Sequence, residues 1–232
     1  MSGVLEALRG GLVVSVQASP GTPLDAPEHI AAMARAAALG GAAGIRAVEV
    51  AAVKDAVTLP VIGLRKRPVE GSAVYITPTL EDARAAAASG ADIVAVDATL
   101  RPRPDGVELA ALVAELPVPV LADIDCFEAG VAARDAGAAA VATTLAGYTG
   151  AAAPTASGGA ASDGPDLELV SALAAELDCP VIAEGRIATP EQARAAFDAG
   201  AFAVVVGTAI TDPVALTRGF AAAARGRAHA AR

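Results

Sequence analysis

The segment Gly90-Ala91-Asp92-Ile93-Val94-Ala95-Val96-Asp97 decides the fold, because variants of it recur along the whole chain. Apart from the first run, at 12–17, each variant is a short apolar run that opens either with glycine and alanine or with proline and valine, and the two kinds alternate. The other runs lie at residues 12–17, 41–46, 59–63, 118–123, 137–144, 179–184 and 200–208. They are continuous and rich in β-branched residues, which is typical of parallel strands that are buried on both faces.

Amphipathic segments rich in alanine and leucine separate most of these runs. They predict helices over residues 28–39, 80–89, 107–116, 126–136, 166–177, 190–199 and 213–225. A less regular helix is expected at 49–57, and the first dozen residues are expected to form a short helix over the barrel bottom. Glycines 40, 90, 137 and 200 are expected to end helices and turn the chain into the next strand.

Eight β-then-α units in 232 residues predict an α/β fold, a single (β/α)8 TIM barrel with a parallel eight-stranded core. No interdomain linker interrupts the pattern, so residues 1–232 are expected to form one domain. A doubly wound open sheet is the alternative, because the number of strands alone does not prove closure. The stretch 150–164, rich in Ala, Gly, Ser, Pro and Thr, is interpreted as a mobile loop.

The composition excludes several classes of protein. Lys and Arg number 17 against 26 Asp and Glu, a formal charge of −9 that argues against a nucleic-acid partner. No stretch approaches about 18 consecutive apolar residues, so no membrane span is expected. The first residues do not read as a secretory signal, and two cysteines, Cys126 and Cys179, are too few for a disulfide framework. A cytoplasmic protein is expected.

Most of the apolar runs end in a polar residue. In (β/α)8 barrels the carboxyl ends of the strands form the mouth, where catalytic groups stand. The residues at or just after these ends are Gln17, Arg46, Lys66, Asp97, Asp123, Thr143 or Thr144, Glu184, and Gly207-Thr208. Singly, an aspartate there could cap the next helix, and Arg46 could pair with a surface carboxylate. As a set they predict a concave polar site.

Lys66 and Glu184 are the strongest candidates for acid–base chemistry. Lys66 lies between Arg65 and Arg67, where the alternation of side chains directs it inward; the alternative is a solvated basic loop. Loss of water and nearby guanidinium charge would both lower the pKa of this lysine and make it a base near neutral pH. Glu184 follows a buried strand and is expected at the barrel mouth rather than unpaired in the core.

The loops after the last two strands predict a phosphate site. Gly185-Arg186 and Gly207-Thr208 stand where barrels of this kind often hold phosphate with backbone N–H groups. No metal site and no nucleotide motif is expected from the sequence. Tyr75, beyond the third strand, suits either packing or a substrate contact.

The chain resembles the N-acetylmannosamine-6-phosphate 2-epimerases of bacterial sialic-acid catabolism. The resemblance covers residues 11–215, and its motifs come in the family's order. They are Gln17-Ala18-Ser19-Pro20-Gly21, Gly44-Ile45-Arg46-Ala47, Leu59–Gly63 with Lys66, Val74–Leu80, Asp97-Ala98-Thr99, Ala122-Asp123-Ile124, Thr143–Thr149, Val181–Ile187 and Val205–Thr211.

The resemblance implies an isomerase that interconverts N-acetylmannosamine 6-phosphate and N-acetylglucosamine 6-phosphate without a cofactor. It implies that Lys66 moves the C2 proton of the ring-opened sugar and that Glu184 assists as acid or base. Gln17, Arg46, Tyr75 and Asp123 match substrate-contacting positions, and Gly185, Arg186, Gly207 and Thr208 match the phosphate region. One lysine could serve both faces of the intermediate, or Lys66 and Glu184 could act as two bases.

One departure from the family concerns the phosphate region. Asp212 stands where the family usually has an arginine, and a carboxylate there would repel phosphate unless it turned away to cap the next helix. The alternatives are therefore an epimerase of a related or unphosphorylated amino sugar, and a barrel that binds sugar phosphate without turnover. Analogy with related barrels suggests a homodimer.

Overall fold

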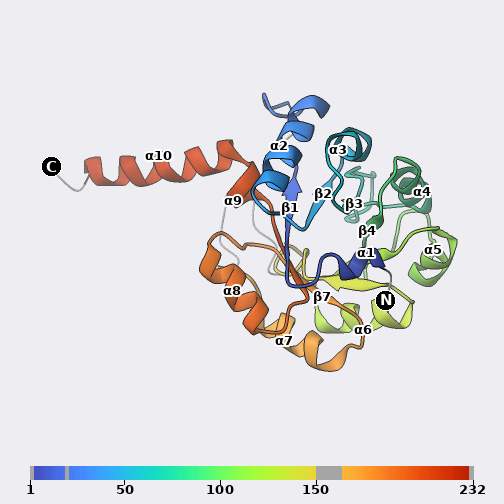
Figure 1. Cartoon of the computed structure of the whole chain (residues 1–232). Helices are drawn as coiled ribbons and strands as arrows, with labels where there is room; N and C mark the ends of the chain where they lie inside the picture. Colours follow the sequence, from blue (N-terminus) through green and yellow to red (C-terminus); the bar gives the residue numbers. More distant parts are fainter. Residues whose placement is uncertain (1–2, 19–20, 150–163, 230–232) are drawn as a thin grey trace.

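The chain folds into a closed barrel of parallel strands surrounded by helices (Figure 1). The computed structural model describes residues 3–18, 21–149 and 164–229. The strands pair in sequence order, and β8 pairs with β1. They are β1 (Leu12–Val16), β2 (Gly44–Ala47), β3 (Val61–Gly63), β4 (Ile93–Asp97), β5 (Val120–Asp123), β6 (Ala140–Ala142), β7 (Val181–Glu184) and β8 (Ala203–Val206). The closure confirms the predicted (β/α)8 barrel and excludes the open sheet.

Helices follow the strands as the sequence predicts. They are α1 (Gly3–Glu6), α2 (Pro27–Leu39), α3 (Val50–Ala56), α4 (Leu80–Ala88), α5 (Leu109–Glu115), α6 (Phe127–Asp135), α7 (Leu167–Glu176), α8 (Pro190–Asp198), α9 (Thr208–Thr211) and α10 (Pro213–His229). The short helix α9, which was not predicted, is added after β8. In the described part of the chain, no helix combines the length and the apolar character needed to cross a bilayer. The predicted loop at 150–164 lies, except for Gly164, outside the described residues.

Most strands begin two or three residues later than predicted, because the proline or glycine residues that open each run lie just before the strand. Proline has no N–H to donate, but the carbonyls of Pro60, Pro119 and Pro180 each accept a hydrogen bond from the preceding strand. In the other kind of run the opening glycine serves as a turn; Gly90, for example, has φ of +96°. At the end of α2 this role belongs to Gly41, with φ of +91°, and not to the predicted Gly40, whose φ is −76°.

Side chains of alternate residues along each strand point into the barrel. The lower interior is apolar and contains Val13, Ile62, Ile93, Leu121 and Ile182, with Leu5 and Leu8 beneath them. The outward residues, such as Val14, Val94 and Val204, pack against the helices in two further apolar clusters. Continuing the inward series upward by two residues at a time leads to Arg46, Lys66, Asp123, Thr144, Glu184 and Gly207.

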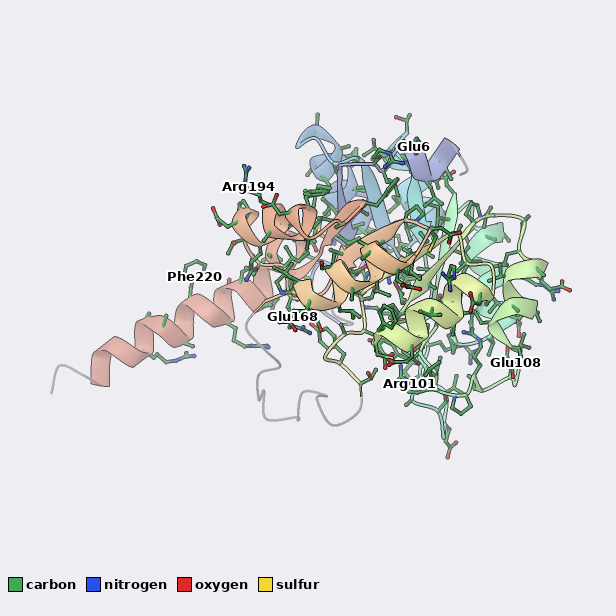
Figure 2. All side chains as sticks on the ribbon, turned by 90° about the horizontal axis from the view of Figure 1, so that it is seen from below. Glu6, Arg101, Glu108, Glu168, Arg194 and Phe220 are labelled. Atoms are coloured by element: carbon green, nitrogen blue, oxygen red, sulfur yellow. The ribbon has the colours of Figure 1, made fainter. Side chains whose placement is uncertain are left out.

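The last helix, α10, extends away from the barrel instead of lying along its wall (Figure 1). Its first turn adjoins α9, and its far part projects into solvent. Val214, Leu216 and Phe220 on this helix are 43%, 39% and 78% exposed. Figure 2 shows the Phe220 side chain directed away from the barrel.

Candidate active site

A cavity of about 970 Å³ opens at the carboxyl ends of the strands. Nine of the ten residues predicted for the site line it: Gln17, Arg46, Lys66, Tyr75, Glu184, Gly185, Arg186, Gly207 and Thr208. The tenth, Asp123, is completely buried beside Arg46. A smaller cavity of about 380 Å³ near α1, lined by Arg9, Asp178 and Cys179 among others, holds none of the predicted residues. The barrel mouth is therefore the candidate site.

A buried ion pair forms the floor of the cavity. Arg46 donates from Nη1 to Asp123 Oδ1 at 3.0 Å and from Nη2 to Asp123 Oδ2 at 2.6 Å. The two side chains are 1% and 0% exposed, so water does not screen the pair. Arg46 Nη1 also lies 3.3 Å from Glu184 Oε2. The Arg46 guanidinium is thus held between two carboxyl groups in one fixed plane.

Burial and the two carboxyl groups have opposite effects on Arg46. Burial alone would lower the pKa of Arg46, but the negative charges of Asp123 and Glu184 outweigh it and raise that pKa above its ordinary value. The guanidinium is therefore permanently charged. Its buried Nε atom has no hydrogen-bond partner among the described residues.

Two threonines after β6 hold Glu184 from both ends. Thr143 Oγ1 accepts from the Glu184 amide at 3.1 Å and donates to the Glu184 carbonyl at 2.9 Å, which fixes the backbone. Thr144 Oγ1 lies 2.6 Å from Asp123 Oδ1 and 3.1 Å from Glu184 Oε2, so it joins the two carboxyl groups. Burial, followed by repulsion from Asp123, raises the pKa of Glu184 despite the attraction of Arg46.

Lys66 is directed into the mouth by its two neighbours. Arg67 donates from Nη2 to Asp82 Oδ2 at 2.6 Å, and Arg65 Nε lies 3.6 Å from Asp82 Oδ1. Because alternate side chains point to opposite sides, Lys66 then faces the cavity. An isolated antiparallel bridge to Ile76 fixes its backbone. Lys66 therefore lines the cavity, although much of its side chain is open to solvent.

The environment of Lys66 favours its neutral form. The residue is exposed to the open mouth. Protein crowds its amine, however, and the loss of water lowers the pKa of Lys66, as does the positive charge of Arg46. Glu184 and Asp123 oppose this shift without reversing it. A lysine with a lowered pKa has more of the free amine near neutral pH and can act as a base.

Gln17 and Tyr75 lie at the cavity wall. Gln17 Nε2 donates to the buried Ser15 hydroxyl at 2.6 Å, which orients its amide at the end of β1. Tyr75 is 38% exposed, and burial together with the charges of Asp123 and Asp97 raises the pKa of its hydroxyl. Both side chains offer neutral polar groups to a ligand in the mouth.

The predicted phosphate residues occupy one side of the cavity. Gly185 has φ of +105° and Arg186 has φ of +55°, so the chain makes a left-handed turn directly after β7. Arg186 donates from Nε to the Gly164 carbonyl at 2.8 Å and from Nη1 to the Ala146 carbonyl, and its guanidinium covers the Tyr148 ring. Gly207 directly precedes the short helix α9, which begins at Thr208.

Asp212 turns toward the last helix. Its Oδ1 accepts from the Ala215 amide at 2.9 Å, which caps α10. The sequence left open whether this carboxylate faces phosphate or turns away, and the cap supports the second arrangement. Asp212 still contributes to the cavity lining, so its charge remains part of the site.

A network beside the mouth was not predicted from the sequence. Thr77 has φ of +45°, and its hydroxyl donates to the Ala95 carbonyl at 2.6 Å while accepting from the Arg65 amide at 3.1 Å. Arg103 donates to the carbonyls of Asp97 and Thr77, which ties the loop after β4 to the loop that carries Lys66. Asp97, at the end of β4, is buried, and its Oδ1 accepts a hydrogen bond from the Thr99 hydroxyl. This carboxylate therefore helps to hold the wall of the cavity in place.

Among the described residues, no group of three or more His, Cys, Asp or Glu side chains is placed to hold a metal ion. The charged groups that line the mouth are instead the Lys66 amine, the guanidinium groups of Arg46 and Arg186, and four carboxyl groups, those of Asp25, Glu49, Glu184 and Asp212. Such a set can move a proton and stabilise negative charge on an oxygen atom.

Comparison with known proteins gives consistent matches over nearly the whole chain. Residues 30–226 match the family model described as "NanE: Putative N-acetylmannosamine-6-phosphate epimerase". A relative from Cutibacterium acnes, named "Putative N-acetylmannosamine-6-phosphate 2-epimerase", is 49% identical over 231 residues and covers 96% of this chain and 97% of its own. A relative with the same name from Escherichia coli is 46% identical over 209 residues, covering 88% and 87%. The solved N-acetylmannosamine-6-phosphate 2-epimerase from Clostridium perfringens superposes with a TM-score of 0.88 at 38% identity and covers 95% and 96% of the two chains.

Proposed function

Because the chain belongs to the family of N-acetylmannosamine-6-phosphate epimerases, we propose that it interconverts N-acetylmannosamine 6-phosphate and N-acetylglucosamine 6-phosphate. The observation that carries this proposal is that Lys66, Arg46 and Glu184 line one cavity at the barrel mouth. A base, a fixed cation and a carboxyl group around one small ligand are what an epimerisation next to a carbonyl requires.

The reaction begins with the C2 proton of the ring-opened sugar. Lys66 takes this proton, and the electron pair of the C2–H bond moves toward the carbonyl to leave an enolate with its negative charge on the C1 oxygen. Arg46 cannot lose its proton and is held in place by Asp123, so its charge favours that oxygen without rearrangement. Lys66 returns its proton to the opposite face of C2 after the intermediate has rotated, which gives the epimer and restores the free amine. If Glu184 supplies the proton instead, transfer of the proton held by Lys66 back to Glu184 restores both groups.

The phosphate is assigned to the part of the cavity formed by the loops after β7 and β8. Gly185, Gly207 and Thr208 offer backbone N–H groups where side chains leave room, and Thr208 adds a hydroxyl. Two of the three guanidinium nitrogens of Arg186 are bound to backbone carbonyls. The third, Nη2, has no hydrogen-bond partner in the described part of the chain and is the group that Arg186 offers to phosphate.

Asp212 is the observation behind a second candidate, an epimerase of an unphosphorylated amino sugar. Its place in the cavity lining would suit a neutral hydroxyl better than a phosphate dianion. Its bond to the Ala215 amide favours the phosphorylated substrate, because the cap occupies one of its oxygens and orients the group toward α10.

The test is exchange at C2 in heavy water, followed by proton NMR, with the phosphorylated and the free sugars in separate reactions. We expect loss of the C2 proton signal with the phosphorylated sugars and none with the free ones. Lys66→Ala is expected to abolish the exchange. Lys54→Arg is the matched control, because Lys54 is the other lysine of the chain and pairs with Asp92 outside the site. Exchange with the free sugars alone would favour the second candidate, and binding without exchange would favour a non-catalytic barrel.

We further propose a homodimer in the cytoplasm, where sugar phosphates are found. The projecting helix α10 supports the dimer, since Leu216 and Phe220 lie four residues apart on one face and are exposed. Light scattering coupled to size-exclusion chromatography measures the mass directly. The expected mass is twice the 22.6 kDa of the chain, and Phe220→Ser is expected to shift the equilibrium toward the monomer.

A further inference from the structure

Thr144 occupies the space between two carboxyl groups that stand on different strands. Its Oγ1 lies 2.6 Å from Asp123 Oδ1, at the end of β5, and 3.1 Å from Glu184 Oε2, at the end of β7. A threonine hydroxyl carries one proton and can donate only one hydrogen bond at a time. It therefore cannot donate to both carboxyl groups. One carboxyl group accepts the proton of Thr144, and the other can form a hydrogen bond with Thr144 only by donating a proton of its own.

Asp123 is the carboxyl group that receives the Thr144 proton. It already accepts two hydrogen bonds from Arg46, which marks it as the ionised partner of a buried pair. The 2.6 Å contact to Thr144 has the length of a hydroxyl donating to a carboxylate, whereas 3.1 Å is long for such a bond. With its proton given to Asp123, Thr144 Oγ1 has only lone pairs to offer Glu184.

We propose that Thr144 is a positioning residue that keeps Glu184 in its protonated form, by donating to Asp123 and accepting the proton on Glu184 Oε2. Glu184 then donates to Thr144, Thr144 donates to Asp123, and Arg46 donates to Asp123 from the other side. Each of the contacts from Glu184 to Thr144 and from Thr144 to Asp123 then has one donor and one acceptor. With Glu184 ionised, its Oε2 and Thr144 Oγ1 would face each other with lone pairs only.

Four groups face Glu184 and must be weighed together. Burial and the charge of Asp123 favour the neutral form, while Arg46 Nη1 at 3.3 Å and the Lys66 amine favour the ionised form. A hydrogen bond donated by Thr144 to Glu184 would also lower the pKa of Glu184, so the direction of that bond decides the contribution of Thr144. Arg46 is already bound to Asp123 through both terminal nitrogens, so much of its charge is compensated. The balance raises the pKa of Glu184, and the hydrogen-bond geometry points in the same direction.

The consequence for the reaction rests on the proposed function. A protonated Glu184 can donate to a sugar oxygen, but it cannot take the C2 proton. The task of the base then falls to Lys66, and Glu184 is the acid, either toward a sugar oxygen or toward the opposite face of C2. Thr144, which also lines the cavity, would thereby determine which of the two groups is the acid.

The experiment titrates Glu184 directly by carbon-13 NMR of protein labelled at the glutamate carboxyl carbon. The Glu184 resonance is identified by its absence in Glu184→Gln. In the unaltered protein we expect the chemical shift of a neutral carboxyl group well above pH 4.3, where an ordinary glutamate is half-ionised. Thr144→Val, which keeps the shape but removes the hydroxyl, is expected to lower the midpoint by about one pH unit or more, a tenfold change in proton affinity.

Two control variants separate the shift of the Glu184 midpoint in Thr144→Val from a general disturbance of the packing around the site. Thr144→Ser retains the hydroxyl and is expected to keep the midpoint. Thr143→Val removes the neighbouring hydroxyl, which contacts only the backbone of Glu184, and is expected to leave the midpoint in place. Asp123 keeps both bonds to Arg46 in every variant, so the midpoint reports the loss of the acceptor.

The proposal is overturned if Glu184 titrates like an ordinary glutamate in the unaltered protein, or if Thr144→Val raises the midpoint or leaves it unchanged. If Thr144→Val does not fold, Thr144→Ala is titrated with the same criterion. The readout needs no substrate, so a failure here is distinct from a failure of the C2 exchange that tests the proposed function.

Discussion

Replacing Arg46 with methionine would leave the carboxylate of Asp123 buried without its partner. Methionine keeps most of the unbranched stem of arginine, so the change removes charge and hydrogen bonds with little loss of packing. The two side chains are 1% and 0% exposed, and water cannot reach Asp123 to take the place of the guanidinium. Removal of one partner from such a pair costs about 3–5 kcal/mol of unfolding free energy.

Urea unfolding followed by circular dichroism measures this loss, and the same variant should melt roughly 6–20 °C below the parent. Arg84→Met is the matched control. It makes the same substitution in a pair with Glu115 whose side chains are 56% and 53% exposed, where a loss below about 1 kcal/mol is expected.

A second substitution tests the cause. In the double variant Arg46→Met with Asp123→Leu, no charge is left uncompensated, and a large part of the lost stability should return. A loss of less than about 1 kcal/mol in Arg46→Met, or no recovery in the double variant, would refute the account of a water-free ion pair beneath the cavity.

Three further predictions concern single groups of the site. The pKa of Lys66 is lowered, so kcat/KM for C2 exchange should rise with pH through a midpoint below the ordinary lysine value of about 10.4; a midpoint at or above that value would contradict the assignment of the base. The pKa of Glu184 is raised in the folded chain, so between the ordinary and the raised pKa the folded chain binds more protons than the unfolded chain. The free energy of unfolding should therefore fall as the pH rises through that window. Urea unfolding of Glu184→Gln should lack this pH-dependent contribution. Asp212→Ala should lower the unfolding free energy by about 0.5–2 kcal/mol through loss of the α10 cap and should leave KM for the phosphorylated sugar unchanged or lower, whereas a higher KM would show that Asp212 contributes to binding.

The repeat made the barrel predictable, because each of its two forms contains the physical reason for a strand start. Proline can accept but not donate, and glycine can take the left-handed conformation that the turn needs. The same alternation of side chains placed Lys66, Glu184 and Arg46 on inward positions, and the structure brings them to one cavity. Strand starts and inward positions depend only on the spacing of residues along the chain, which can be taken directly from the sequence.

Contacts between neighbouring strands could not be predicted in the same way. Thr144 appeared in the sequence as one of two threonines at a strand end, with no sign that it stands between Asp123 and Glu184. The partners of Arg186 were hidden for the same reason, since the carbonyls of Gly164 and Ala146 belong to other loops. Distances below 3.5 Å depend on register and loop conformation, which apolar periodicity does not specify.

Lys66 shows how a correct expectation can have a different physical origin. The sequence places Arg65 and Arg67 beside this lysine, and guanidinium charge was expected to lower its pKa. The structure sends both of these side chains toward Asp82, which compensates them on the far side of the strand. The cation that acts on Lys66 is Arg46, which is twenty residues earlier in the chain and inside the barrel. Arg65 and Arg67 thus orient the base, whereas the loss of water and, after it, the charge of Arg46 lower its pKa. A variant of Asp82 should disturb the position of Lys66 before it changes the charge around it.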